Sequence, residues 1–296
     1  MSHITVLRQE AVEALAPDTG DVIVDATLGS GGHTRAIADA VGTTGRVIAL
    51  DVDPGAIADA QLWKDIYEGV LSLHKANFVN VHSCLAELEI DAVDGILADL
   101  GWRMEQFTDG GRGFSFKSEE PLHMTFGSPA EYLLTAEDIV NQWDEGDIAN
   151  VLYGYGEERY ARRIAAAIVS KREQSQIQTA AQLAEVIAGA VPAVYRRSRV
   201  HPATKSFQAL RIAVNDELTV LESFITNAFS VLNGGGRLVI ITFHSLEDRI
   251  VKHMFRDLVQ ADLAEAITKK PVLPTAEECV HNPRARSAKL RAIKKY

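Results

Sequence analysis

The sequence predicts an α/β fold in which a parallel sheet is covered by helices on both faces and is interrupted by a separate helical domain. Near-continuous apolar strands alternate with helical segments, a pattern typical of parallel sheets that are buried on both faces. Residues 102–236 separate two of these strands, although one crossover needs only about a dozen or more residues. That interval has room for an inserted domain.

Buried strands are predicted where short apolar runs end in polar or turn-forming residues. These strands cover residues 22–28, 46–53, 94–101 and 237–244. Residues 73–81 are a further candidate. The segment "HTRAIADAV" supplies a helix between the first two strands, so these elements form a βαβ unit.

The long interval carries helix signals throughout. Capping boxes begin helices at Thr135 and Thr179, each followed three residues later by an acid or an amide. Between them, helical spacing joins Tyr160, Ile164, Ala167 and Ile168. We therefore predict an all-α domain over residues 104–203, inserted into a sheet domain that comprises residues 1–103 and 204–296.

Residues 206–236 predict one long helix that ends at the glycines 234–236. Its apolar residues step by threes and fours in a single stripe: Phe207, Leu210, Val214, Leu218, Leu221, Ile225, Ala228 and Leu232. Gln208, Arg211 and Asn215 lie beside that stripe. They form either a solvated face or a polar strip that faces a substrate.

Composition narrows the class of protein. The two cysteines, Cys84 and Cys279, lack metal-site spacing, which argues against a disulfide scaffold and fits a reducing compartment. The first residues lack the pattern of a signal peptide, and no apolar run reaches the ~20 residues of a membrane span. We expect a cytoplasmic protein with no membrane contact. The net charge of −10 disfavours nonspecific nucleic-acid binding, but the basic segments 195–199 and 284–296 remain compatible with an RNA substrate.

The turn "LGSGG" (residues 28–32) follows a strand and opens a helix, which suggests a nucleotide-binding loop rather than a merely flexible turn. Asp51 ends the next strand, where an acid accepts ribose hydroxyls. A nicotinamide dinucleotide fits less well, because Thr34 replaces the third glycine and Asp25 would repel a pyrophosphate. A cationic nucleoside such as S-adenosylmethionine suits two acids around a glycine turn.

Eight motifs in order resemble one family from end to end of the chain. They are "DATLGSGGHT", "LDVDP", "DGILADLG", "RGFSF", "GEERYARRIA", "HPATKSFQALRIAVN", "FHSLEDRIVK" and "NPRARSAKLR". The chain is similar to the bacterial S-adenosylmethionine-dependent 16S ribosomal RNA (cytosine-N4)-methyltransferases. The resemblance implies a Rossmann-like class I methyltransferase domain with an inserted all-α domain that recognises RNA.

The resemblance also implies a set of cofactor contacts. They are Gly31, Gly32, His33, Asp51, Phe78, Asp99 and Gln106. Two of them have other interpretations. His33 would otherwise cap the helix that follows it, and Phe78 would otherwise be core packing.

The implied reaction is methyl transfer to N4 of a cytidine in the decoding region of the small-subunit RNA. Cytosine N4 is a poor nucleophile, so we expect Asp99 to be catalytic by polarising it, with a backbone carbonyl at Leu100 or Gly101 as a second candidate acceptor. Methyl transfer requires no metal, and we expect none. The base must leave its stack to enter a pocket. The expected partner is 16S ribosomal RNA, within the small ribosomal subunit; whether the chain forms a homodimer stays open.

Two segments depart from the family pattern. "DLG" is followed by Trp102, Arg103 and Met104 instead of a small, serine-bearing stretch, and residues 122–127 read "LHMTFG" where the family has "LDMRM" and an acid. Either the loop has repacked, or the substrate or the activity differs. Trp102 is a candidate for stacking on the base. The candidate substrate contacts are Trp102, Arg112, His123, Arg211, Asn215 and His244.

Further alternatives stay open. "SLED" (residues 245–248) is a capping box in its own right, which gives Ser245 and Asp248 a structural role. The altered "LHMTFG" segment allows a ribosome-assembly factor that has lost catalysis but still binds RNA and the cofactor. An amine methyltransferase with a different nucleic-acid substrate is the third option. Finally, the basic tail is expected to pair with "ITKKPV" as a hairpin at the sheet edge. Its basic residues Arg284, Arg286 and Lys289 either contact phosphates or only make that edge more soluble.

Overall fold

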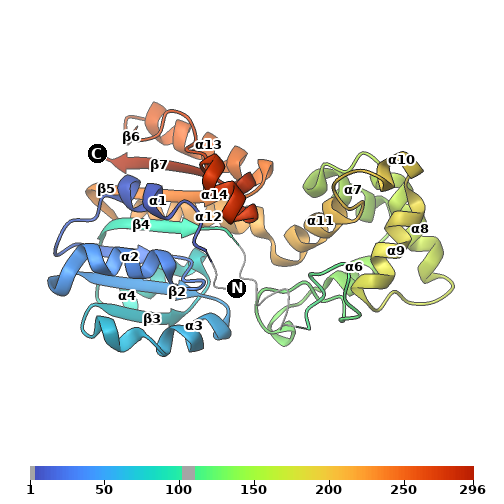
Figure 1. The fold of residues 1–296 in the computed structure, drawn as a ribbon, viewed down its shortest axis with the longest axis horizontal. Helices are drawn as coiled ribbons and strands as arrows, with labels where there is room; N and C mark the ends of the chain where they lie inside the picture. The colour runs from blue at the N-terminus through green and yellow to red at the C-terminus, as the bar shows by residue number, and fades with distance from the viewer. Residues whose placement is uncertain (1–3, 102–110) are drawn as a thin grey trace. The chain divides into compact units, whose positions relative to one another are not determined.

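The computed structural model describes residues 4–101 and 111–296. The chain divides into two compact units. A sheet unit comprises Met1–Trp102 and Leu218–Tyr296, and a helical unit comprises Arg103–Glu217. Figure 1 shows the two units in the colours of the chain, and each is described by itself below.

The sheet unit is built on one sheet of seven strands in the order β3-β2-β1-β4-β5-β7-β6. The first five strands along the chain run parallel, and β7 pairs antiparallel with both β5 and β6. Their bounds are β1 Val22–Asp25, β2 Arg46–Asp51, β3 Leu71–Lys75, β4 Val93–Asp99, β5 Leu232–Thr242, β6 Ala264–Ala266 and β7 Lys289–Lys295.

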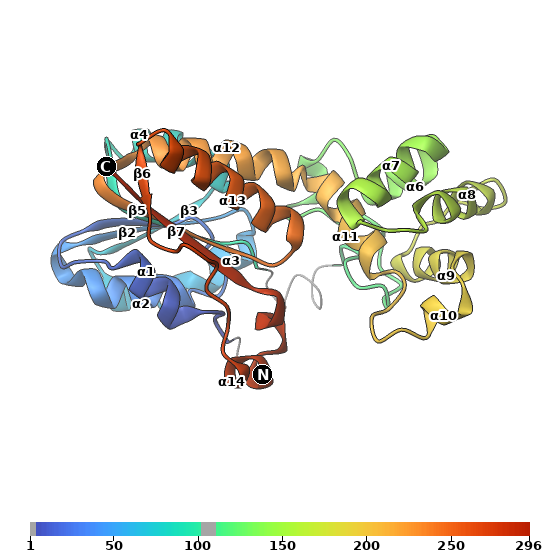
Figure 2. The same ribbon diagram turned by 90° about the horizontal axis from the view of Figure 1, so that it is seen from above.

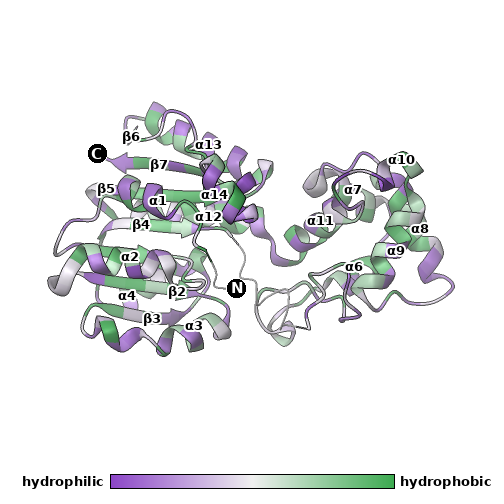
Figure 3. Ribbon diagram, in the orientation of Figure 1, coloured by the Kyte–Doolittle hydropathy of each residue, from purple (hydrophilic) through white to green (hydrophobic). Residues whose placement is uncertain are grey.

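Helices cover both faces of this sheet (Figure 2). One buried cluster joins the sheet to α1 (Arg8–Leu15), α2 (Gly32–Val41) and α3 (Pro54–Gln61). The other joins it to α4 (Val81–Glu87), α12 (Glu217–Ser230) and α13 (Ser245–Gln260). Figure 3 shows hydrophobic residues along the central strands. The predicted parallel sheet, covered on two faces, is confirmed.

The remaining elements of the sheet unit are short. The weak strand candidate at residues 73–81 forms β3 only as far as Lys75, and Phe78–Asn80 is a 3-10 turn (η3). The other short helices are η1 Gly42–Thr44, η2 Lys64–Tyr67, α14 Ala276–His281 and η5 Pro283–Ser287. Among the described residues, no helix has the length and apolar character needed to span a bilayer.

The helical unit packs short amphipathic helices around a shared apolar core. Its elements are η4 Pro129–Glu131, α6 Ala136–Gln142, α7 Glu145–Gly156, α8 Ala161–Arg172, α9 Ala180–Ala190, α10 Ala193–Arg196 and α11 Thr204–Asn215. Helix α7 packs against α8 and α11, and α8 against α9. Both predicted capping boxes are confirmed: Thr135 with Asp138 begins α6, and Thr179 with Gln182 begins α9.

The single long helix predicted over residues 206–236 is wrong. The chain breaks at Asp216, whose φ of 46° is left-handed, so α11 and α12 are separate helices. An aspartate tolerates that conformation better than most residues. The glycines 234–236 do not end a helix either, since they lie within β5. Helix α11 consequently belongs to the helical unit, which ends at Glu217 rather than at the predicted residue 203.

The C-terminal tail also differs from its prediction in one respect. It does pair with the "ITKKPV" segment, because Val272 and Leu290 exchange backbone hydrogen bonds of 2.9 Å in both directions. Strand β7 is not at the sheet edge, however, but lies between β5 and β6. Lys289 and Arg291 extend to Asp248 of α13, at 2.9 and 2.7 Å. Lys289 therefore has an internal partner.

Candidate active site

Asp25, Asp51 and Asp99 are the last residues of β1, β2 and β4, which are neighbours in the sheet. Because these strands are parallel, the three side chains gather at the edge of the sheet that is formed by the carboxyl ends of its strands. In open α/β sheets this edge is where ligands bind. The glycine turn 29–32 follows β1 at the same edge.

Asp25 is fully buried and bonded within the protein. Its carboxylate accepts a hydrogen bond from the Thr34 hydroxyl at 2.6 Å and one from the Thr27 backbone N–H at 3.1 Å. Burial raises its pKa to about 7, against the opposing effect of those two hydrogen bonds; the charges of Asp99 and Asp51 add to the rise. A negative charge at this position consequently favours a cation beside it.

Asp25→Asn is expected to raise the free energy of unfolding of the ligand-free protein at pH 8. The pKa of Asp25 rises from 3.8 to about 7 on folding, so the folded state binds more protons than the unfolded state across that range. Stability from this residue therefore falls as pH rises from about 4 to about 7. The gain on substitution is at most about 4 kcal/mol at pH 8 and shrinks toward zero near pH 4.

Urea unfolding at pH 4.5 and pH 8 measures this gain. The matched control is Asp91→Asn, at an exposed position just before β4. Substituting Asp91 should change stability little at either pH. A gain for Asp25→Asn that is the same at both pH values would contradict the assignment.

Asp51 ties the glycine turn to the end of β2. One of its carboxylate oxygens accepts the Gly29 backbone N–H at 2.9 Å, and the other accepts the Asp53 N–H at 2.8 Å. Asp51 is therefore oriented by the backbone at the end of β2, the position at which an acid accepts ribose hydroxyls in folds of this kind.

Asp99 is held by backbone groups at the end of β4. Its N–H donates to the Thr27 hydroxyl at 2.6 Å, and its Oδ1 accepts the Gly101 N–H at 2.9 Å. Burial raises the pKa of Asp99 to about 7; the Gly101 hydrogen bond lowers it, and the charge of Glu247 raises it further. A carboxylate with such a pKa can accept a proton near neutral pH.

The glycines of the turn are required by the protein's own packing. At Gly31, where φ is +75°, an added Cβ would lie 2.3 Å from the Trp63 ring. At Gly32 it would lie 1.7 Å from Thr5 Oγ1. We expected these glycines to admit a ligand. The structure instead shows Trp63 and Thr5 filling that space, while an added Cβ at Gly29 would meet only the Thr27 carbonyl, at 3.9 Å.

His33 is buried behind this turn. Its Nε2 lies 3.1 Å from the Val6 carbonyl oxygen, and its Nδ1 lies 3.7 Å from Asp99 Oδ2. The residue that begins α2 as its N-cap is Gly31, so the alternative in which His33 caps the helix is wrong. His33 thus connects the N-terminal segment to Asp99.

Phe78 packs edge-on against Phe224, with ring centroids 4.9 Å apart, and joins the apolar cluster of that face. It is half-buried, so part of the ring stays accessible at the end of β3. The core-packing interpretation describes its observed contacts. Contact with an adenine stays a prediction.

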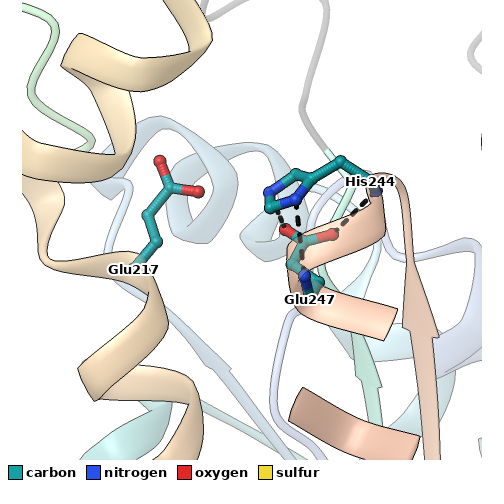
Figure 4. Close-up of side chains that lie close together, drawn as sticks. All are labelled: Glu217, His244 and Glu247. Atoms are coloured by element: carbon teal, nitrogen blue, oxygen red, sulfur yellow. Dashed lines mark hydrogen bonds and ion pairs between the residues drawn. The ribbon is translucent and has the colours of Figure 1, made fainter. Parts of the chain in front are cut away.

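The helix start near His244 corrects the expected capping box. His244, not Ser245, is the N-cap of α13, and its N3 partner is Glu247, not Asp248. Figure 4 shows the His244 ring over the Glu247 carboxylate, with Nε2 and Oε1 3.0 Å apart. An imidazole nitrogen can accept the N3 N–H as a hydroxyl does, which the usual Ser/Thr pattern does not cover. Both side chains therefore have a structural role.

Several candidate substrate contacts in the helical unit bind the protein itself. The amide side chain of Asn215 accepts the Phe126 N–H at 2.9 Å and donates to the Met124 carbonyl at 2.8 Å. Arg112 donates to the Phe126 carbonyl. The guanidinium of Arg211 donates to the two carboxylate oxygens of Glu217 at 2.6 and 2.8 Å. The Glu217 side chain is drawn in Figure 4. These contacts shape the divergent "LHMTFG" loop.

His123 differs from those candidates. Within the described part of the chain, its Nδ1 is buried and has no hydrogen-bond partner. Its backbone carbonyl accepts the Ala136 N–H at 3.0 Å, which joins the loop to the start of α6. Trp102, Gln106 and the neighbouring Arg103 and Met104 lie outside the described residues, so their predicted roles stay predictions.

Sequence reasoning missed the residues that support the strand ends and the glycine turn. The Thr34 hydroxyl donates to the Asp25 carboxylate, the Thr27 hydroxyl accepts the Asp99 backbone N–H, and Trp63 and Thr5 pack on the glycines. Of these residues, only Thr34 could be noticed in the sequence, because it stands where a dinucleotide-binding loop has its third glycine. The contacts of Thr5 and Trp63 come from segments distant in sequence, and nothing local indicates them.

The comparisons with known proteins decide the family. The model of the MraW methylase family matches residues 1–296. The chain belongs to the MraW methylase family. It is 48% identical over 289 residues to "Ribosomal RNA small subunit methyltransferase H" of Synechococcus elongatus, covering 98% of this chain and 93% of that protein. It is 42% identical over 308 residues to the protein of the same name from Brevibacillus brevis, covering 99% and 98%.

Membership of the MraW family makes this chain a methyltransferase, with S-adenosylmethionine as its cofactor. The carboxylates at the carboxyl ends of the strands fit that molecule. Asp51 lies at the strand end where an acid accepts ribose hydroxyls, and Asp25 and Asp99 supply the negative charge that a sulfonium needs. A phosphate-bearing cofactor would instead meet three carboxylates.

Proposed function

We propose that this MraW-family protein methylates N4 of a cytidine in the decoding region of 16S ribosomal RNA, within the small ribosomal subunit and in the cytoplasm. The observation that carries the proposal is Asp99: a carboxylate at the end of β4, with a pKa raised to about 7 and fixed by Thr27 and Gly101. Such a group suits an exocyclic amine, which needs polarisation before attack and loses a proton after it.

The bound cofactor supplies a methyl group activated by its sulfonium centre. Asp51 accepts the ribose hydroxyls and thereby sets the position of the nucleoside relative to β4. Asp25 offers a buried carboxyl group, and the fraction of it that is negatively charged increases as the pH rises through about 7. Asp99 accepts a hydrogen bond from the amine and holds the nitrogen in line with the methyl carbon, so positioning and electrostatics provide the acceleration.

The helical unit offers a basic surface for RNA phosphates. Arg196, Arg197 and Arg199 are exposed, although the chain as a whole is acidic. The segment that bears them is anchored, because the Tyr195 hydroxyl donates to the buried Glu158 at 2.7 Å. Burial and Glu158 raise the pKa of Tyr195 to about 12, so it remains a donor at all physiological pH values.

Replacing Arg196, Arg197 and Arg199 together by Gln is expected to lower the slope of log affinity against log salt by about 2 for small-subunit RNA, as loss of about three phosphate contacts requires. Filter binding over a salt series measures the slope. Lys289→Gln is the control, since Lys289 Nζ is engaged by Asp248 at 2.9 Å. Its slope should stay unchanged. If the triple variant retained the wild-type slope, these arginines would not contact phosphates.

Mass mapping of the RNA tests the proposed function. Small subunits from a strain lacking this protein are incubated with it and isotopically labelled S-adenosylmethionine, then digested to nucleosides and fragments. We expect the label on N4 of one cytidine in the decoding region. Label on another base or atom would overturn the substrate assignment.

A second candidate rests on the divergent loop at residues 122–127, whose backbone is clamped by Asn215. A protein with that loop repacked could bind RNA and cofactor as an assembly factor without catalysis. The same experiment separates the two functions, because an assembly factor would bind the subunits and transfer no label.

A further inference from the structure

The tautomer of the His33 imidazole is set by its neighbours. The side chain is 4% exposed, and Nε2 lies 3.1 Å from the Val6 carbonyl oxygen. A carbonyl oxygen only accepts hydrogen bonds, so Nε2 must carry the proton. In neutral His33 the lone pair of Nδ1 then faces Asp99 Oδ2 at 3.7 Å.

The Val6 carbonyl is itself held in place by the C-terminal region. The backbone N–H of Leu7 donates to Glu278 Oε1 at 2.8 Å, and Asn282 Nδ2 donates to the Ile4 carbonyl at 3.0 Å. Leu7 adopts a left-handed φ of 49°, and Val6 and Leu7 are buried. The partner of Nε2 is thus fixed by contacts from α14 and the turn after it.

We propose that His33 is a positioning residue for proton transfer: it receives, through Asp99, the proton that leaves the methylated amine. This inference rests on the proposed function, because it concerns the amine whose methylation is proposed there. It adds a residue that acts on the proton after Asp99 and does not contact the base.

The N4 lone pair forms a bond to the methyl carbon, and the carbon–sulfur bond breaks with its electron pair on sulfur. The nitrogen then loses one proton to Asp99, which passes it to His33 Nδ1. The resulting imidazolium donates to the Val6 carbonyl through Nε2 and forms an ion pair with the restored Asp99 carboxylate, whose Oδ2 lies 3.7 Å from Nδ1.

The surrounding charges favour that imidazolium. Asp99 faces it directly, and among the described residues the nearby carboxyl groups are Asp25 on β1, Asp51 on β2 and Glu247 on α13, the last of which also contacts the imidazole of His244 at 3.0 Å. Glu278 of α14 is engaged by the Leu7 N–H. A positive charge on His33 is therefore stabilised by nearby carboxylates. A proton that stayed on Asp99 would instead neutralise one of those carboxylates.

The first test compares His33→Gln with His82→Gln, a substitution of an exposed histidine on α4. Single-turnover methyl transfer to small subunits is followed from pH 5.5 to 9 at saturating cofactor. For His33→Gln we expect the plateau rate to fall about 10- to 100-fold. The midpoint of the acid limb should move about one unit lower, because Asp99 alone holds the proton less tightly than the coupled pair does.

His82→Gln should match the wild type in both quantities. A His33→Gln protein that still makes N4-methylcytidine with the wild-type plateau and midpoint would overturn the inference. So would a rate loss with an unmoved midpoint, which indicates a purely structural role. Label on another atom would count against the proposed function instead, and the two failures are thereby distinguished.

A second measurement does not depend on catalysis or on the folding of His33→Gln. Nitrogen-15 NMR of the wild-type protein reports the His33 tautomer, and we expect the proton on Nε2 above the titration midpoint. In Asp99→Asn the His33 midpoint should fall by about one unit, since its anionic neighbour is lost. A proton on Nδ1, or a His33 midpoint indifferent to Asp99→Asn, would contradict the coupling.

Discussion

Asp99→Asn is expected to lower the rate constant for methyl transfer about 1,000-fold, within the range that a positioned base contributes. The amide keeps the size of the carboxylate and can still accept the Gly101 N–H, now 2.9 Å from Oδ1. It cannot take up the proton that leaves the amine. Affinity for S-adenosylhomocysteine should change by no more than about fivefold, because one carboxylate of the site is lost while the ribose contact at Asp51 stays.

The pH dependence of the wild-type enzyme gives a second test of the same role. The pKa of Asp99 is about 7, so the active carboxylate form is lost as pH falls through that value. Transfer should rise with pH below 7 and level off above it, and Asp99→Asn should lack this limb. Asp91→Asn serves as the exposed control. Wild-type rates in Asp99→Asn would show that another group takes the proton.

Asp51→Asn is expected to weaken binding of both S-adenosylmethionine and S-adenosylhomocysteine about 100-fold. The carboxylate accepts the N–H groups of Gly29 and Asp53 and is proposed to accept the ribose hydroxyls. An amide has one acceptor oxygen, so one N–H and one hydroxyl lose their partner, each costing about 1–3 kcal/mol. Equilibrium dialysis with each labelled ligand gives the two affinities.

Asp25→Asn is the matched variant for this measurement at pH 8. It removes charge near the sulfonium but leaves the ribose contact, so it should weaken the binding of S-adenosylmethionine more than the binding of S-adenosylhomocysteine. Asp51→Asn should weaken the binding of both ligands to the same extent. If Asp51→Asn discriminated between the ligands, its contact would be with the sulfonium region and the ribose assignment would be wrong.

Local sequence patterns predicted the strands and their carboxyl ends well. A short apolar run that ends in an acid has few other interpretations, so the predicted strands exist. The observed strands β1, β2 and β4 end at Asp25, Asp51 and Asp99, two or three residues before the predicted ends at residues 28, 53 and 101. The capping boxes at Thr135 and Thr179 were equally visible, because a cap and its N3 partner lie within one helical turn.

Features that depend on distant contacts could not be predicted. The apolar stripe continues across Asp216, so periodicity did not reveal the break between α11 and α12. Packing of Thr5 and Trp63 on the glycine turn, and the Val6 carbonyl on His33, join segments far apart in the chain. The cap at His244 was missed because imidazole is an uncommon cap, and the pattern "SLED" one residue later fitted the usual rule.

Titration calorimetry of the wild-type protein with S-adenosylmethionine and S-adenosylhomocysteine, at pH 6 and pH 8, tests the carboxylate pocket most directly. Both ligands share the ribose and the amino acid, so the ratio of their association constants isolates the sulfonium. Asp25 and Asp99 ionise near pH 7, and we predict that this ratio rises about tenfold or more between pH 6 and pH 8. A ratio that is flat with pH, or no binding of either ligand, would contradict the account.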